Sequence, residues 1–496
     1  MKIILEMRPA LDGHAGIPQE TRLLFRGLGL IDGFTVDGLV QSSGKVLAKG
    51  LPAGSGALQA AISKNQQINR LSRVVVSLQH HPSHKWYARA TTESVDFIVP
   101  VKMVMRHLVG AKQQLTRFDA THYKDFIWRN LFSKTLPYED FDNVTKSGFR
   151  ILQAPWTTMH VCALAARRVG LSLYPRIDTN DFDLMIAQTP FPGSVTGKTK
   201  MVVRYHDAIP VLMPHTISDK AFHQASHYRA LEHNVACGAY FSCVSEATRQ
   251  DLISIFPEAE SRSITIHNMV SHHYFPEESS ATRVAEVIRT RLHTMVAIKS
   301  AVKVDTRAAS ANSKPIDYLL MVSTLEPRKN HLALLSAWEQ LRVEKFPNLK
   351  LITVGMLGWD HDLILKKFRP WQERGELFML EDVPSPELRL LYKHARATVC
   401  PSFGEGFDFS GVESMRSGGV VAASDIGVHR EVYGEAAEYF SPYSTAEMVA
   451  AIGTLVDAQN SARRLALIEK GAEVSSRYLP EKILPKWREF LTGLCK

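Results

Sequence analysis

Two carboxylates, Glu405 and Glu413, lie in the segment Pro-Ser-Phe-Gly-Glu-Gly-Phe-Asp-Phe-Ser-Gly-Val-Glu, which spans residues 401–413. The segment follows an apolar strand pattern and enters a helical one, so backbone N–H groups and the positive helix end face a ligand at the strand tip. Carboxylates placed in this way can accept hydrogen bonds from different hydroxyls of one polyol-bearing ligand. Taken alone, the motif fits equally well a Glu413 that favours the start of the helix and a Glu405 that is a solvated loop charge.

Cationic side chains occur at a second strand-to-helix loop, where Arg328 and Lys329 lie within residues 323–331. Two cations beside the amide donors of a helix N-terminus suit a diphosphate. The alternative is a charged surface loop, which the strand–loop–helix context disfavours.

A histidine, His206, directly follows the strand pattern at residues 201–205. In α/β domains, ligands bind at the face where the parallel strands end. His206 could therefore relay a proton or orient a hydroxyl there. A purely structural role is the alternative, because the chain has 20 histidines.

The elements that must position these residues alternate between strands and helices. The chain opens with a strand at 2–7, a loop containing Gly13 and Gly16, and a helix at 19–30, as an α/β domain with a parallel sheet does. Further strands are predicted at 73–78, 182–187, 201–205 and 240–244.

The same alternation restarts after a break at about 272–313 that ends in a run of small polar residues. Strands are predicted at 316–322, 349–354, 377–380, 397–400 and 420–423. Helices are predicted at 284–292, 331–343, 386–395, 410–417 and 445–458. Two doubly wound α/β domains would enclose a ligand cleft at the carboxyl ends of both sheets.

Length and composition agree with this division. A chain of 496 residues exceeds one compact core, and 45% hydrophobic with 22% charged residues excludes wholesale disorder and a fibre. The net charge of +9 fits an acidic substrate, an anionic membrane or nucleic acid without choosing among them. The N-terminal apolar stretch is too short for a signal peptide, and no run reaches the roughly 18 apolar residues of a membrane span.

The cysteine and aspartate patterns predict neither a disulfide framework nor a metal site. The five cysteines are widely spaced without a C-x-x-C pair, which favours a reducing cytosol. Two Asp-x-Asp tripeptides, at 140–142 and 181–183, could hold a divalent metal. About one such tripeptide is expected by chance, and the second opens an apolar strand, so neither is interpreted as a ligand set.

Taken together, the motifs resemble the retaining glycosyltransferases of family 4, which have the GT-B architecture. The resemblance rests on the Glu-x7-Glu pattern of Glu405 and Glu413, the Leu-Glu-Pro-Arg-Lys-Asn segment at 325–330, and the His-Asp pair that begins at His206. Matching pieces also occur at 245–251 and 422–432. The resemblance covers residues 180–275 and 316–445 well, and the first 30 weakly.

The sequence departs from that family at several positions. Asp408 replaces the usual glycine and adds a carboxylate that could select one sugar hydroxyl or repel a carboxylated sugar. The first glycine loop reads Gly13-His-Ala-Gly16, and Met269 follows Asn268 where the family has glycine. The stretch before His206 is about twice the usual length, which bears on the acceptor.

The resemblance implies two Rossmann-like domains that face a central cleft. The expected parts are an acceptor-binding domain at 1–272 with an insertion at about 80–180, a linker at 273–315, a nucleotide-sugar-binding domain at 316–475, and a helix at 476–496 that packs back on the first domain. The expected reaction is hexose transfer from a nucleotide diphosphate to an acceptor hydroxyl, with retention at the anomeric carbon and without metal or cofactor.

The resemblance also assigns roles to residues. Arg328 and Lys329 are expected to neutralise the diphosphate, Glu413 to bind the ribose, and Glu405 to contact the donor sugar. His206 is expected to set the position of that sugar. The remaining donor contacts are expected from Gly16, Ser323, Gly406, Phe407, Asp408, Phe409 and Ser410.

For substrates, the resemblance implies GDP-mannose as donor and a glycan or lipid-linked acceptor in surface polysaccharide synthesis. It implies a cytoplasmic enzyme in contact with the inner face of the membrane, and no nucleic acid partner. Residues 101–118 could form an interfacial helix, although a buried domain helix is favoured. The alternative functions are a phosphorylase of the same fold, a nucleotide-sugar epimerase, and a nucleotide-sugar-binding scaffold without catalysis.

Overall fold

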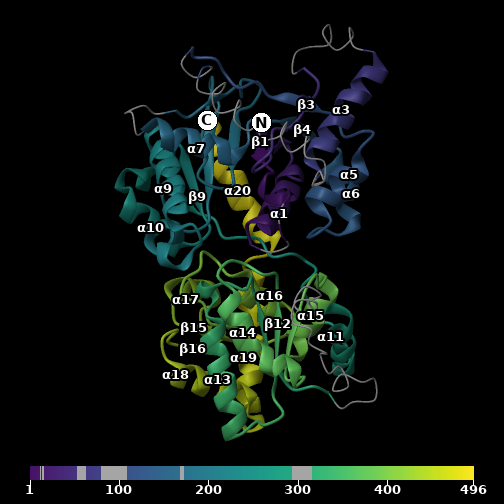
Figure 1. The fold of residues 1–496 in the computed structure, drawn as a ribbon, viewed down its shortest axis with the longest axis vertical. Helices are drawn as coiled ribbons and strands as arrows, with labels where there is room; N and C mark the ends of the chain where they lie inside the picture. The colour runs from purple at the N-terminus through teal and green to yellow at the C-terminus, as the bar shows by residue number, and fades with distance from the viewer. Residues whose placement is uncertain are drawn as a thin grey trace.

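The computed structural model describes residues 1–11, 13, 16–52, 63–79, 105, 109–167, 173–292 and 315–496. These residues form two lobes, one above the other in Figure 1. An eight-stranded sheet forms the centre of the first lobe and a six-stranded sheet that of the second. Helices pack on both faces of each sheet, so the architecture is α/β, as the sequence predicts.

The sheet of the first lobe has the order β10-β9-β8-β6-β1-β2-β4-β3. Its strands pair in parallel except for β3, which is antiparallel to β4. The strands are β1 (Lys2–Glu6), β2 (Thr35–Val40), β3 (Thr116–Phe118), β4 (Gly148–Ile151), β6 (Leu184–Ala187), β8 (Lys200–Tyr205), β9 (Tyr240–Cys243) and β10 (Ser263–Thr265). A separate two-stranded sheet pairs β5 (Arg176–Ile177) with β7 (Ser194–Val195).

The α-helices that accompany this sheet are α1 (Ile17–Gly29), α3 (Lys64–Leu78), α5 (Lys124–Ile127), α6 (Phe141–Thr145), α7 (Trp156–Arg167), α8 (Ile209–Leu212), α9 (Lys220–Ala236) and α10 (Glu246–Ile255). Helix α1 begins after Gly16, whose φ of 70° favours glycine. Gly16, which was predicted to lie in the loop before the first helix, therefore lies where the chain must turn.

The second sheet is entirely parallel, in the order β13-β12-β11-β14-β15-β16. Its strands are β11 (Tyr318–Val322), β12 (Lys350–Val354), β13 (Leu377–Leu380), β14 (Ala397–Cys400), β15 (Val421–Ser424) and β16 (Ala437–Phe440). Its helices are α11 (Val284–Arg291), α13 (His331–Glu344), α14 (Asp362–Glu373), α15 (Ser385–His394), α16 (Phe409–Arg416), α17 (Gly427–Tyr433), α18 (Thr445–Val456) and α19 (Ser461–Ser476). Helix α11 lies within the predicted linker and packs into the core of this lobe.

The strand predicted at 73–78 is wrong, because these residues end helix α3. Ser63 caps that helix, since its hydroxyl accepts from the backbone N–H of Gln66, whose side chain accepts from the N–H of Ser63 in return. Leu71 and Val74 are buried three residues apart, which is helical spacing. The run of valines suggested a strand, but the cap and the tertiary packing decide the conformation. The other predicted strands and helices are present, with small shifts at their ends.

The final helix, α20 (Pro480–Cys495), belongs to the core of the first lobe. Its residues Ile483, Trp487 and Leu491 are fully buried against residues of β1 and α1. Figure 1 shows α20 running from the junction of the lobes into the first lobe, beside α1. The strands of the two sheets fall on either side of the predicted linker at 273–315, but the exact boundaries stay predictions.

Two predictions concerned membranes. Among the described residues, no helix has both the length and the apolarity to cross a bilayer. Seven residues of the helix predicted at 101–118 (101–104 and 106–108) lie outside the described residues, and its last three residues belong to β3 instead.

Candidate active-site cleft

A cavity of about 470 Å³ lies between the two lobes, at the carboxyl ends of both sheets. The loops that follow β1, β8 and β9 line the cavity from the first lobe. The loops that follow β11, β12 and β14 line it from the second lobe. All residues predicted to act in the site line this cavity: Gly16, His206, Ser323, Arg328, Lys329, Glu405, Gly406, Phe407, Asp408, Phe409, Ser410 and Glu413. The fold therefore brings together side chains that are almost 400 residues apart in the chain.

The two predicted cations lie on a short turn, Pro327–Lys329, between β11 and α13. Asn330 follows in a left-handed conformation, with φ of 62°, and its side chain donates to the carbonyls of Pro401 and Pro442. This anchor holds the turn beside the loop that follows β14. Arg328 and Lys329 can therefore both reach that loop.

Glu405 is bound by both cations. Its carboxylate lies 2.9 Å from Arg328 Nη1 and 2.5 Å from Lys329 Nζ. Burial alone would raise the pKa of Glu405, but the two cations outweigh it and keep that pKa below its ordinary value. The alternative interpretation of Glu405 as a solvated loop charge is thus wrong, because its side chain is only 8% exposed.

Glu413, on α16, reaches across to the first lobe. Its carboxylate accepts a hydrogen bond from Gln19 Nε2 at 2.8 Å and one from the Tyr392 hydroxyl at 3.1 Å. Burial raises the pKa of Glu413 to about 7, although these donors oppose the rise. Gln19 lies in the first turn of α1, so this bond ties the glycine loop of one lobe to the helix of the other.

The raised pKa of Glu413 predicts a pH dependence of stability. A carboxyl whose pKa is higher in the folded than in the unfolded chain binds more protons when folded, so its contribution to stability falls as pH rises from 4.5 to about 7. A shift of this size corresponds to about 3 kcal/mol. Denaturant unfolding of Glu413→Gln should show a stability advantage over the wild type that grows across this pH range. A difference that does not change with pH would contradict the prediction.

The sequence suggested that Asp408 offers a free carboxylate to a sugar, but both of its carboxylate oxygens have partners within the protein. One of its oxygens accepts from the backbone N–H and hydroxyl of Ser410, at 3.2 and 2.6 Å. The other lies 3.2 Å from Nε2 of His429, which is fully buried. Asp408 has φ of 60° and caps α16, so its side chain fixes the turn that a glycine would otherwise make.

His429 was assigned no role from the sequence. It lies in α17 after β15, and β15 pairs in parallel with β14, the strand that precedes Asp408. Adjacent parallel strands end at the same edge of a sheet, so the positions of His429 and Asp408 after neighbouring strands could have predicted that the two residues lie close together.

His206 follows β8 and contributes its backbone to the contact between the lobes. Its Nε2 lies 3.4 Å from Gln188 Oε1. Burial, and then the charge of Arg204, hold the pKa of His206 well below its ordinary value, so the imidazole is neutral. A Cβ on Gly406 would lie 1.8 Å from the carbonyl oxygen of His206, so the lobes meet where only glycine fits.

Another contact between the lobes involves Glu431, on α17. Its two oxygens accept from the backbone N–H groups of Glu246 and Ala247, at 2.7 and 2.9 Å, at the start of α10. His267 Nε2 lies 2.7 Å from the same carboxylate. An acid from one lobe thus caps a helix of the other, which the sequence could not show because the two partners are far apart in the chain.

The Asp-x-Asp tripeptides lie outside the residues that line the cleft. Asp140 pairs with Arg26 at 2.9 Å, and Asp183 accepts from the backbone N–H of Lys2 at 2.7 Å. Within the described part of the chain, no cluster of three or more histidine, cysteine or acidic side chains could hold a metal ion.

Comparison with known proteins gives a family for the second lobe. Residues 303–473 match the family model described as "Glycosyl transferases group 1". The serotype-specific mannosyltransferase WbdA of Escherichia coli is 37% identical over 134 residues, which cover 27% of this chain and 16% of WbdA. The O-antigen chain mannosyltransferase B of Escherichia coli is 37% identical over 119 residues, 24% of this chain and 31% of the relative. The matches thus span less than a third of these relatives.

Solved structures match almost the whole chain. Sucrose-phosphate synthase from Thermosynechococcus elongatus has a TM-score of 0.57 at 12% identity, covering 99% of this chain and 98% of that one. The Anabaena protein Alr3699/HepE in complex with UDP and glucose has a TM-score of 0.55 at 13% identity, covering 99% and 100%. At such identities the likeness establishes the fold, which is the predicted GT-B arrangement.

Proposed function

We propose that this chain transfers mannose from GDP-mannose to a glycan or lipid-linked acceptor in surface polysaccharide synthesis, because residues 303–473 match the group 1 glycosyltransferase model and the chain has the GT-B fold. Two of its relatives are named as mannosyltransferases, which supports mannose as the transferred sugar. A lipid-linked acceptor would bring the enzyme to the inner face of the cell membrane. The observation that carries the proposal is the cleft in which Arg328 and Lys329 from the turn after β11, Glu405 from the loop after β14, and Glu413 from α16 converge.

In the proposed reaction, Arg328 and Lys329 bind the diphosphate of the donor. Negative charge grows on this group as the bond to the anomeric carbon breaks, and fixed cations lower the barrier. Glu405 keeps both cations in place before the diphosphate arrives. Once the diphosphate shares these cations, the Glu405 carboxylate can accept hydrogen bonds from the donor sugar.

Retention of configuration is proposed to follow from attack on the face that the diphosphate leaves. The acceptor oxygen bonds to the anomeric carbon, the bond to the diphosphate breaks, and the acceptor proton passes to a diphosphate oxygen. His206, neutral in its buried position, orients the sugar by hydrogen bonding. Glu413 is proposed to bind the ribose hydroxyls in its ionised form.

The proposed role of the two cations predicts that transfer survives chelation. Arg328 and Lys329 supply the positive charge that a divalent ion would otherwise supply to the diphosphate. Initial rates with and without EDTA should agree. Loss of activity in EDTA, with recovery on addition of Mn²⁺, would contradict this assignment of the diphosphate site.

The donor is tested by thermal unfolding with GDP, UDP and dTDP, followed by a transfer assay with GDP-mannose. A ligand that binds only the folded chain adds about 2.7 kcal/mol of stability at 100 times its Kd. We expect stabilisation by GDP. Stabilisation by UDP or dTDP alone would contradict GDP-mannose as the donor. Tight binding without transfer or donor hydrolysis would indicate a nucleotide-sugar-binding scaffold without catalysis.

A further inference from the structure

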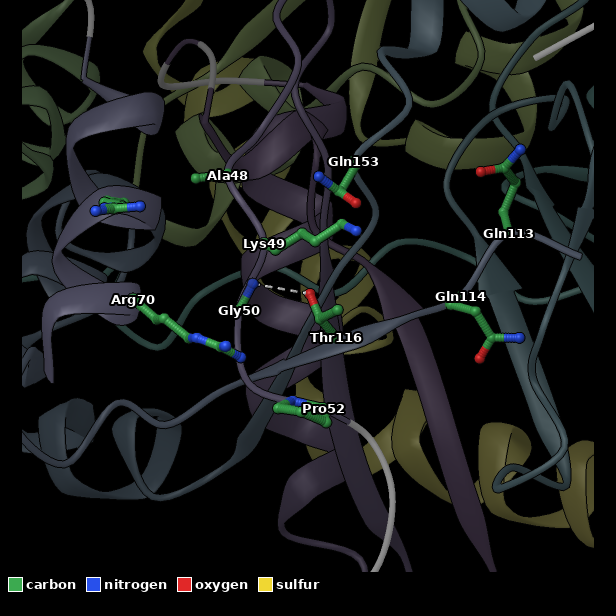
Figure 2. Close-up of a pocket in the computed structure, with 10 residues that line it drawn as sticks. Ala48, Lys49, Gly50, Pro52, Arg70, Gln113, Gln114, Thr116 and Gln153 are labelled. Carbon is green, nitrogen blue, oxygen red and sulfur yellow. Dashed lines mark hydrogen bonds between the residues drawn. The ribbon is translucent and has the colours of Figure 1, made fainter. Parts of the chain in front are cut away.

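A second cavity, of about 520 Å³, lies in the first lobe and shares no lining residue with the cleft. Figure 2 shows residues from separate segments around it. The lining residues come from the chain after β2, from α3, from the chain before and at the start of β3, and from the chain after β4: Ala48, Lys49, Gly50, Pro52, Arg70, Arg73, Gln113, Gln114, Thr116 and Gln153.

The cavity lies at the carboxyl edge of the first sheet. Strand β4 ends at Ile151, two residues before Gln153, and Thr116 pairs with Ile151 across the antiparallel β3–β4 ladder. Strands β1, β6 and β8 end at the same edge, because they run parallel to β4 through the sheet. Ligands of open α/β sheets bind at this edge.

Close backbone packing forms the floor of the cavity. The N–H of Gly50 donates to the Thr116 hydroxyl at 3.0 Å, the bond drawn in Figure 2. A Cβ at Gly50 would lie 2.3 Å from the carbonyl oxygen of Arg117, so only glycine allows this approach. The segment that carries Lys49 is therefore held against β3.

The charge that faces the cavity is positive. Lys49, Arg70 and Arg73 line it, and none of them forms an ion pair with another described residue. Arg70 and Arg73 are three residues apart on α3, so they share a face of the helix and repel one another. Such a set favours an anion, and guanidinium groups bind phosphate through two parallel hydrogen bonds.

Amide side chains complete the lining. Gln114 donates to Asp178 at 2.9 Å, and Gln153 donates to the carbonyl of Leu47 at 3.1 Å. These bonds fix two amides whose carbonyl oxygens can accept from hydroxyl groups. Fixed amides beside cations are the groups that recognise a phosphorylated sugar, and the cavity volume suits a ligand of that size.

We propose that this cavity binds a phosphorylated saccharide, with Arg70, Arg73 and Lys49 on the phosphate and the glutamines on the sugar hydroxyls. The inference rests on the proposed function in one respect, which is that the ligand is part of the acceptor. The binding site itself stands on the cavity and its cations.

The test uses calorimetric titration of mannose 6-phosphate into the full chain, compared with mannose. We expect binding of the phosphorylated sugar only, weakened at least tenfold in Arg70→Glu/Arg73→Glu and about threefold in the milder Lys49→Ala. Lys64→Glu is the matched control, because it changes an exposed cation of the same helix that does not line the cavity. It should bind as the wild type does.

Several outcomes would overturn the proposal. If Lys64→Glu weakened the binding of mannose 6-phosphate equally, the effect would come from the net charge of the protein and not from the cavity. Loss of binding in Lys329→Ala would show that the ligand binds in the cleft instead. Equally tight binding of glucuronic acid would show that the site does not require a phosphate. Nucleotide binding, measured on the same variants, separates this result from the proposed function. It should be unchanged in Arg70→Glu/Arg73→Glu even if the phosphorylated sugar does not bind.

Discussion

Replacing Lys329 by alanine should lower the turnover of glycosyl transfer by about 10²- to 10³-fold, because it removes a fixed charge aimed at the leaving diphosphate. Nζ of Lys329 lies 2.5 Å from Glu405, so its position is set before a donor binds. Steady-state kinetics with saturating donor would measure the loss.

Two comparisons keep this result interpretable. Removing one partner of a buried ion pair also costs stability, so unfolding should be followed alongside activity, and Lys329→Ala/Glu405→Gln should recover stability without recovering turnover. Arg369→Ala removes a cation whose partner, Glu373, is half exposed, and should leave both quantities nearly unchanged. Turnover within a few-fold of the wild type in Lys329→Ala would contradict the diphosphate role.

Gly406→Ala should abolish most of the activity while leaving both lobes folded. The added Cβ would lie 1.8 Å from the carbonyl oxygen of His206 and 3.3 Å from Val244 Cγ2, both in the other lobe. Neither the backbone at His206 nor its strand can retreat cheaply, so the lobes must separate. An open cleft would let water in and move His206 away from the donor. We expect a loss of at least 100-fold in turnover and a larger radius of gyration in solution scattering.

Gly404→Ala provides the matched control, two residues away in the same loop. Its Cβ would lie 2.8 Å from the sulfur of Met213, also in the first lobe. That sulfur belongs to a flexible side chain that can rotate aside. Gly404→Ala should therefore keep most of its activity, and an equal loss in both variants would show that the loop, and not the approach to His206, is what matters.

The sequence predicted those parts of the molecule that depend on local pattern. Strands such as β11 and β14 are short apolar runs, and the loops after them carry Arg328, Lys329 and Glu405. Since parallel strands end at one edge, the strand pattern indicated that these loops lie close together, and the resemblance to the glycosyltransferase family supplied the roles of the residues. Helix α3 was missed because its run of valines outweighed the capping box at Ser63.

Long-range pairs could not be predicted in the same way. The cap that Glu431 places on α10, and the bond from Gln19 to Glu413, each join the two lobes. Such contacts depend on how the lobes meet, which no periodicity records. The opposite error occurred at Asp408, which resembled a free sugar ligand until His429 and Ser410 were found to occupy its oxygens.

Helix α20 has a consequence for synthesis on the ribosome. The strands of the first lobe are complete once residue 265 has emerged, yet Trp487 and Leu491 belong to the core of that lobe. At about 5–20 residues per second, the apolar surface that α20 will cover stays exposed to solvent or to a chaperone for roughly ten seconds or more. Folding of this chain is therefore not strictly vectorial, since its first lobe must wait for its last helix.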